Sequence, residues 1–326
     1  MKAIVMNQYG EADVMRIGEA DLPQPRADEV QIRVKAAGIN RADVLQRRGL
    51  YPPPEGASHL LGLEVSGEIV ALGPEAKQFE IGQLVCALLA GGGYAEVVVV
   101  SEKAVFPLPD GVSVEEGAAI PEAFLTAYVN LFELGQLQAR QQVLIHAGAS
   151  GIGTAAIQLV KAAGAEAYVT AGSDEKVDLC RQLGAKASWN YRNGSFLPWI
   201  QQTCASGGVD LVLDMVGGSY ASANLQALGR DGRYVLVGLV GGAKAEAFPL
   251  DQVLMKRLQI KATTIRSQTD VQKGQWISSF TARFASLFAA GELRPVIDEV
   301  FPAEAVAEAH RKMESGRHAG KLLLRF

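Results

Sequence analysis

The chain has 326 residues, a length typical of about two domains. Hydrophobic residues make up 48% and charged residues 20%, as in an ordinary globular protein. The net charge is −4, and no Lys/Arg cluster indicates nucleic-acid or lipid binding. The three cysteines are widely spaced, which excludes a disulfide framework or a Cys-based zinc site. With no signal-peptide pattern and no long apolar run, we expect a cytoplasmic protein without a membrane span.

The first part of the chain has the pattern of an all-β domain. Short alternating segments at 31–36, 65–70, 83–88 and 94–100 are separated by Gly and Pro turns, which predicts a small antiparallel barrel. A helical stretch then runs from Glu115 to Leu134, and Pro121 can mark a break within it.

The middle of the chain alternates between strands and helices. Apolar strands are expected at 143–145, 166–170, 209–214 and 233–237, and helical patterns follow the first two. This alternation predicts βαβ units and a doubly wound parallel sheet of the Rossmann type. The fold class is therefore α/β, with a β-barrel domain beside a Rossmann domain.

The last part of the chain changes pattern again. It has a helix with its apolar side chains between Trp276 and Phe288, a strand at 296–300, a helix at 303–313 and a last strand at 321–326. We expect this tail to rejoin the first domain. The expected boundaries are 1–122 and 268–326 for the barrel domain and 123–267 for the Rossmann domain.

The strongest motif is the glycine-rich turn after the first strand of the middle part. It contains Gly148, Ser150, Gly151, Ile152 and Gly153. Its spacing departs from the usual dinucleotide fingerprint, so the turn alone could be structural. Between a strand and a helix, however, such glycines let a pyrophosphate approach the free N–H groups of the helix N-terminus. The turn therefore predicts a dinucleotide site.

The end of the second Rossmann strand indicates which dinucleotide binds. It reads Thr170-Ala171-Gly172-Ser173 and lacks the acid that usually binds the ribose of NAD. Ser173, Lys176 and Tyr191 can instead hold a 2′-phosphate, which favours NADPH. The alternative is that Ser173 only caps a helix and Lys176 is a surface charge.

At this point the chain resembles a known family over its whole length. It is similar to the zinc-free quinone oxidoreductases of the medium-chain dehydrogenase/reductase superfamily, most of all to the tumour-suppressor-inducible NADPH:quinone oxidoreductases. The stretches that carry the resemblance include 40–43, 61–64, 118–123, 146–159, 170–173, 217–220 and 320–321.

The resemblance implies several further features. These are a GroES-like catalytic domain, an active site in the cleft beside the Rossmann domain, a homodimer, and cofactor contacts from Asn40, Thr126, Gly217, Gly238, Leu239 and Lys321 in addition to the residues above. The segment 258–264 is expected to be the edge strand through which two protomers pair.

Zinc-dependent members of the superfamily carry a Cys near the position of Asn40 and a His-Glu pair where this chain has Leu63-Glu64. An amide and an aliphatic side chain cannot replace these ligands, so no metal is expected. Without a metal to stabilise an alkoxide, a quinone is a better acceptor than a simple carbonyl, because its reduction gives a delocalised phenolate.

Three residues are candidates for catalysis. Tyr51 can donate a hydrogen bond or proton to the substrate, or merely pack on Pro52 to Pro54. Ser150 can touch nicotinamide or substrate, or bond its own backbone. Asn40 can orient either molecule, or cap the turn that follows it.

Other polar residues are interpreted as structural. His146 is expected to pack at the end of its strand, and Asp210 and Asp214 to bond neighbouring loops. The run Gly91 to Gly93 is expected to be a turn, and the aromatic stripe from Trp276 to Phe288 to be core.

Two other functions remain open on the sequence alone. The first is NADPH-dependent reduction of an enone or enoyl thioester, in which Tyr51 would protonate the α-carbon. The second is a non-enzymatic role in binding NADPH or RNA, against which the negative charge argues.

Overall fold

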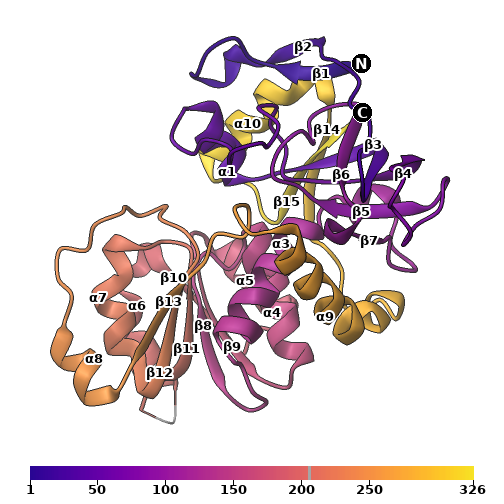
Figure 1. Cartoon of the computed structure of the whole chain (residues 1–326). Coiled ribbons are helices and arrows are strands. Elements are labelled where there is room, and N and C mark those ends of the chain that lie inside the picture. The colour runs from indigo at the N-terminus through magenta and orange to yellow at the C-terminus, as the bar shows by residue number, and fades with distance from the viewer. Residues whose placement is uncertain (205–206) are drawn as a thin grey trace. The chain divides into compact units, whose positions relative to one another are not determined.

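The computed structural model describes residues 1–204 and 207–326 (Figure 1). The chain forms two compact units. Unit 1 contains Met1–Leu125 and Ile265–Phe326, and unit 2 contains Thr126–Thr264. The chain therefore leaves unit 1, builds unit 2 and returns.

Unit 1 is built around a mostly antiparallel seven-stranded sheet with the order β14-β15-β3-β4-β5-β7, in which β6 also pairs with β3. Its strands are β3 (Glu29–Ile39), β4 (Glu64–Leu72), β5 (Leu84–Leu88), β6 (Val97–Ser101), β7 (Val105–Pro107), β14 (Ile297–Pro302) and β15 (Lys321–Arg325). A separate hairpin pairs β1 (Lys2–Val5) with β2 (Arg16–Glu19). The predicted all-β front is confirmed, and β15 pairs antiparallel with β3, so the tail does rejoin it.

The helices of unit 1 pack around this sheet. They are α1 (Arg41–Arg47), α2 (Val114–Gly117), α9 (Asp270–Ala289) and α10 (Val306–Ser315). On α9, Ile277, Phe280, Phe284 and Phe288 are buried, which confirms that the aromatic stripe is core. Trp276 and Leu287 are only partly buried.

The helical stretch expected from Glu115 to Leu134 is not one helix. It is divided into α2, α3 (Pro121–Tyr128) and a π-helical turn (Val129–Leu134), so Pro121 begins a helix. A proline at the first helical position loses no backbone hydrogen bond, because that N–H would have no partner within the helix.

Unit 2 is a six-stranded parallel sheet with the order β10-β9-β8-β11-β12-β13. Its strands are β8 (Gln142–Ile145), β9 (Glu166–Ala171), β10 (Ala187–Asn190), β11 (Val209–Asp214), β12 (Leu228–Leu236) and β13 (Gln259–Ala262). Its helices are α4 (Gly151–Ala162), α5 (Asp174–Gln182), α6 (Phe196–Thr203), α7 (Gly218–Ala227) and α8 (Leu250–Lys256). Figure 1 shows α4 and α5 on one face of the sheet and α6 and α7 on the other.

This strand order confirms the predicted Rossmann domain. Numbered from β8, the order is 3-2-1-4-5-6, and the direction of winding reverses between β8 and β11. The carboxyl ends of these two neighbouring strands are where such sheets bind dinucleotides. The predicted edge strand is also found, because β13 lies at one end of the sheet.

The residues interpreted as structural at the strand ends have that role. His146 is fully buried, with its ring nitrogens 2.8 Å from Thr170 Oγ1 and 2.7 Å from Asn224 Oδ1. Asp214 accepts hydrogen bonds from the N–H groups of Val216 and Gly217, and Asp210 accepts one from Gln142 N–H. Asp214 thereby fixes the loop after β11.

Candidate functional site

The glycine-rich turn of unit 2 joins β8 directly to α4. Ser150 is the N-cap of α4, and its hydroxyl accepts a hydrogen bond from Gly153 N–H at 3.1 Å. The first helical hydrogen bond runs from Thr154 N–H to the carbonyl of Ser150. The N–H groups of Gly151 and Ile152 precede it, so they are oriented out of the helix end, where an anion is favoured.

Two backbone features make this turn tight. Ala147 has a φ of 51°, which a residue with a Cβ rarely adopts. A Cβ at Gly148 would overlap the side chain of Val169 on β9, so only glycine fits. The strain is found where a phosphate would have to approach the backbone, as expected for a binding turn rather than an ordinary connection.

The tip of β9, which lacks an acidic residue, leads directly into α5. The Ser173 hydroxyl caps α5 by accepting a hydrogen bond from Lys176 N–H at 3.3 Å, so the capping role considered for Ser173 is present. Asp174 and Glu175 lie in the first helical turn, where acids suit the helix dipole. A Cβ at Gly172 would overlap the phenol oxygen of Tyr191, which places the Tyr191 side chain beside the tip.

The remaining predicted cofactor residues of unit 2 lie on loops and on α3. Gly217 has a φ of 82°, and a Cβ there would come 2.8 Å from Leu239 Cδ2, so the loops after β11 and β12 touch. The N–H of Gly238 bonds the carbonyl of Asp214. The Thr126 hydroxyl is buried without a hydrogen-bond partner among the described residues. These features fit a dinucleotide, which would bond the helix end and the orphaned hydroxyl.

A second cluster lies in unit 1 and is centred on Glu64. Glu64 Oε1 accepts hydrogen bonds from Asn40 Nδ2 at 2.9 Å and from Lys321 Nζ at 2.5 Å, and Oε2 accepts one from Glu122 N–H at 2.8 Å. Lys321 also donates to the side-chain oxygen of Asn40 and to the carbonyl of Ile39. The Asn40 amide is therefore held at both of its polar atoms.

These bonds revise the expectation for Lys321. The residue is 3% exposed, and the three hydrogens of its ammonium are matched by three acceptors within unit 1. The geometry therefore makes Lys321 a residue that orients Asn40, and the expected contact of Lys321 with the cofactor stays a prediction. Asn40 is also the N-cap residue of α1, the alternative role considered for it, and Asp43 Oδ2 accepts from Asn40 N–H at 2.8 Å in the capping box there.

Tyr51 is partly buried and lies against a cation. The Arg266 guanidinium carbon is 5.2 Å from the centre of the Tyr51 ring. Arg266 is 3% exposed and donates to the Ala90 carbonyl at 2.8 Å and to Gln46 Oε1 at 2.6 Å, so the cation is fixed. Burial raises the pKa of Tyr51, and the charge of Arg266 works against that shift.

Sequence reasoning missed Arg266, because no local motif marks it and its contacts come from residues more than 170 positions away. It also missed Glu122, whose Oε2 is buried without a partner among the described residues. Burial, and then the negative charge of Glu64, raise the pKa of Glu122 to about 8. Glu122 was present in the stretch 118–123 that supports the resemblance, but only the fold shows its surroundings.

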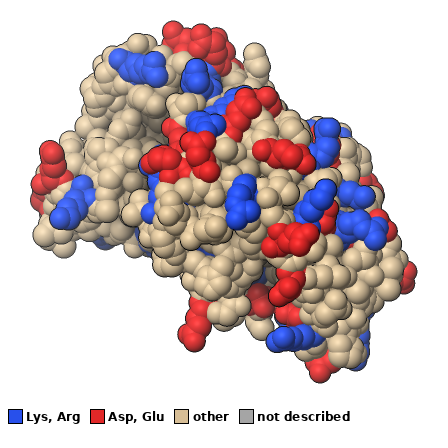
Figure 2. All heavy atoms as spheres, turned by 90° about the horizontal axis from the view of Figure 1, so that it is seen from above, with Lys and Arg blue, Asp and Glu red and all other residues tan. Residues whose placement is uncertain are grey.

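Some arrangements are absent from the part of the chain that the structure describes. No three His, Cys, Asp or Glu side chains gather there as a metal ion would require. Within residues 1–204 and 207–326, no helix is both long and apolar enough to cross a bilayer. On the face shown in Figure 2, acidic and basic side chains are interspersed.

Comparison with known proteins defines the family. Residues 26–110 match the alcohol dehydrogenase GroES-like domain, and residues 151–279 match the zinc-binding dehydrogenase family. The quinone oxidoreductase of Lama guanicoe is 32% identical over 327 residues, covering 99% of this chain and 97% of that protein. The chain therefore belongs to the medium-chain dehydrogenase/reductase superfamily and has quinone oxidoreductases among its relatives.

Solved structures agree. The Escherichia coli quinone oxidoreductase complexed with NADPH has a TM-score of 0.87 at 27% identity, with both chains fully covered. The CurK enoyl reductase has a TM-score of 0.87 at 31% identity, covering 99% of this chain and 98% of that one. The chain also matches part of a phenolphthiocerol/phthiocerol polyketide synthase of Mycobacterium tuberculosis at 31% identity, but it spans only 14% of the length of that protein.

The raised pKa of Glu122 gives a prediction about stability. Between its ordinary pKa of 4.5 and its folded pKa of about 8, the folded state holds a proton that the unfolded state has lost, so stability falls as the pH rises through this window. Glu122→Gln should remove this dependence. In urea unfolding, the free energy of unfolding of the variant minus that of the unchanged protein should increase by at least about 1 kcal/mol from pH 5 to pH 8.5. Glu75→Gln, an exposed change, is the control; parallel pH profiles for all three proteins would contradict the prediction.

Proposed function

We propose that the protein is an NADPH-dependent, zinc-independent quinone oxidoreductase. The observation that carries the proposal is the set of side chains at the positions of the zinc ligands in zinc-dependent members. Asn40 is bound there by Glu64 and Lys321, and Leu63 is an aliphatic side chain. Such a site provides orientation and hydrogen bonds, which suffice for an acceptor as electrophilic as a quinone.

NADPH, when bound, supplies the hydride. We assign the N-terminus of α4, with Ser150, Gly151, Ile152 and Gly153, to the pyrophosphate. The Thr126 hydroxyl, which lacks a partner among the described residues, is assigned to the cofactor as well. Loops 217–218 and 238–239 complete this site.

In unit 1, Asn40 is assigned to orient the nicotinamide or the substrate, because Glu64 and Lys321 hold its amide in one position. Tyr51 is assigned to donate a hydrogen bond to the substrate oxygen, and Arg266 to hold the Tyr51 ring. After hydride transfer the quinone carries a delocalised negative charge, and a proton from water or from Tyr51 completes the hydroquinone.

A second candidate is the reduction of an activated C=C bond, which the likeness to the CurK enoyl reductase favours. Measuring NADPH oxidation with ortho-quinones, para-quinones, enones and crotonyl-CoA, each with and without a chelator, separates the two. We expect turnover with quinones that a chelator leaves unchanged. Turnover confined to crotonyl-CoA, or lost on chelation and restored by zinc, would overturn the proposal.

Tyr51→Phe distinguishes the two mechanisms. With a quinone, solvent can protonate the product, so the change should lower turnover by less than about tenfold. With an enoyl substrate, loss of a positioned acid should lower it by about 10² to 10⁴. Tyr9→Phe, at an exposed tyrosine, is the control. A hundredfold loss with quinones while NADPH binding is intact would make Tyr51 an obligatory acid.

The preference for NADPH is tested at the tip of β9. Lys176→Ala should weaken binding of NADPH by about 1–3 kcal/mol and leave NADH unaffected, because a charge-assisted bond to the 2′-phosphate is lost. Lys161→Ala, on the exposed surface of α4, is the matched control. Cofactor affinities measured by fluorescence titration should show this difference; equal affinity of the unchanged protein for both cofactors would contradict it.

We also propose a homodimer that forms through unit 2. The edge strand β13 directly follows α8 in the chain, and α8 has an exposed apolar surface on which Leu250, Leu254 and Met255 are 70%, 75% and 72% exposed. A second copy that pairs its own β13 would satisfy the edge backbone and cover this surface. Leu254→Glu should convert the dimer to a monomer in light scattering, whereas Leu84→Glu, at an exposed leucine of unit 1, should not. A monomeric unchanged protein at micromolar concentration would refute this.

A further inference from the structure

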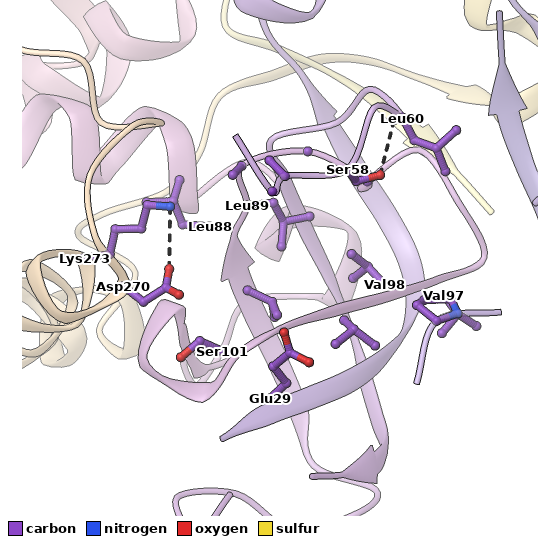
Figure 3. Close-up of a pocket in the computed structure, with 18 of the residues that line it drawn as sticks. Glu29, Ser58, Leu60, Leu88, Leu89, Val97, Val98, Ser101, Asp270 and Lys273 are labelled. Carbon is purple, nitrogen blue, oxygen red and sulfur yellow. Dashed lines mark hydrogen bonds and ion pairs between the residues drawn. The ribbon is translucent and has the colours of Figure 1, made fainter. Parts of the chain in front are cut away.

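Unit 1 contains a cavity of about 310 Å³ that the proposed function does not use (Figure 3). Its walls come from the loop 56–60, the segment 88–92, strand β6 and the start of α9. Leu60, Leu88, Leu89 and the valines of β6 form an apolar side of the cavity, polar and charged groups line the remainder, and its volume is at the lower end of the range for small-molecule sites.

Lys273 is the one cationic side chain among the described residues that line the cavity. Lys273 is 3% exposed and lines the cavity. Its ammonium has one ionic partner among the described residues, the Asp270 carboxylate at 3.9 Å, which is beyond hydrogen-bond distance. Figure 3 shows the two side chains together at one end of the cavity. This ammonium has hydrogen-bond donors to spare, so an acceptor that enters the cavity would gain a charge-assisted hydrogen bond there.

The charges around Lys273 favour an anion as that acceptor. Three other ionisable groups among the described residues act on Lys273. One is a cation, Arg266, and two are acids, Asp270 and Glu122. Asp270 is 53% exposed and therefore screened by solvent. Glu122, with its pKa raised to about 8, is largely uncharged at neutral pH. Among Lys273 and the three groups that act on it, the remaining charge is therefore positive.

Other acids limit the charge of the ligand. Glu29 and Asp21 also line the cavity, and Glu29 is held by a hydrogen bond from Arg26 N–H at 2.8 Å. A ligand with several negative charges would be repelled by them. A ligand with a single carboxylate can bond Lys273 with that group and place an apolar body along β6, without adding further negative charge near Glu29 and Asp21.

We propose that this cavity is a binding site for small apolar monocarboxylates, with Lys273 as the group that bonds the carboxylate. The site lies within unit 1 and is formed by residues other than those assigned to NADPH or to the quinone. Its occupation does not require that the protein reduce quinones.

Burial lowers the pKa of Lys273, and the charges of Asp270 and Glu122 act in the opposite direction. At neutral pH, where Glu122 is largely protonated, a bound carboxylate would join Asp270 as a second negative group at this amine and favour its charged form. The ligand would thus stabilise the ammonium that bonds it.

The test uses 2-naphthoate and its uncharged analogue 2-naphthamide, titrated calorimetrically into the full chain saturated with NADP⁺. Lys273→Met should lower the affinity for 2-naphthoate by about tenfold or more, the usual value of a charge-assisted hydrogen bond. It should leave the weaker binding of 2-naphthamide unchanged. Lys77→Met, the same change at an exposed lysine of unit 1, should have no effect.

A second variant changes affinity in the opposite direction. Asp270→Asn removes the carboxylate that competes for Lys273, so 2-naphthoate should bind several-fold more tightly. Thermal unfolding of each variant checks that it is folded. Absence of 2-naphthoate binding to the unchanged protein, or equal binding to it and to Lys273→Met, would overturn the proposal whether or not the protein reduces quinones.

Discussion

The buried ion pair between Glu64 and Lys321 joins the two ends of the sequence within unit 1. Glu64 lies on β4 and Lys321 begins β15, with 0% and 4% of their side chains exposed. Two desolvated charges are tolerated only where each is also hydrogen-bonded, and here the Asn40 amide, the Glu122 N–H and the Ile39 carbonyl complete the set. Removing either partner would leave a buried charge, so the position of Asn40 depends on both.

This arrangement underlies the chemistry that we propose for the site. In a zinc enzyme, the metal holds the substrate oxygen and stabilises the charge that develops on it. Here a lysine and a glutamate hold an amide, which can orient a partner but cannot polarise a carbonyl as a metal does. The Tyr51–Arg266 contact adds a hydrogen-bond donor fixed by a cation that is itself anchored to Ala90 and Gln46. Such a site suits an acceptor that is already reactive.

Periodicity and turn chemistry were sufficient to predict much of the fold. The strands β8, β9 and β11 are predicted by apolar runs that end near glycines. The reversal of winding between β8 and β11 is the one expected of a doubly wound sheet. The helix division at Pro121 was only partly predicted, because a proline can either end a helix or begin one. Glu122, Arg266 and Lys273 gave no signal, because their meaning comes from burial beside segments distant in sequence, which no local pattern encodes. Lys321 was recognised by resemblance, but its three acceptors became visible only in the fold.

The interrupted course of unit 1 has a consequence for how the chain is made. Strand β15 pairs with β3, nearly 300 residues earlier, whereas every strand of unit 2 pairs within Thr126–Thr264. During synthesis on the ribosome, unit 2 can therefore complete its sheet while the last strand of unit 1 has not yet been translated. Until then residues 36–39 of β3 lack the strand that pairs with them on this side, and Glu64 has no lysine. Nascent unit 1 is thus the part of this protein that would most need protection by chaperones.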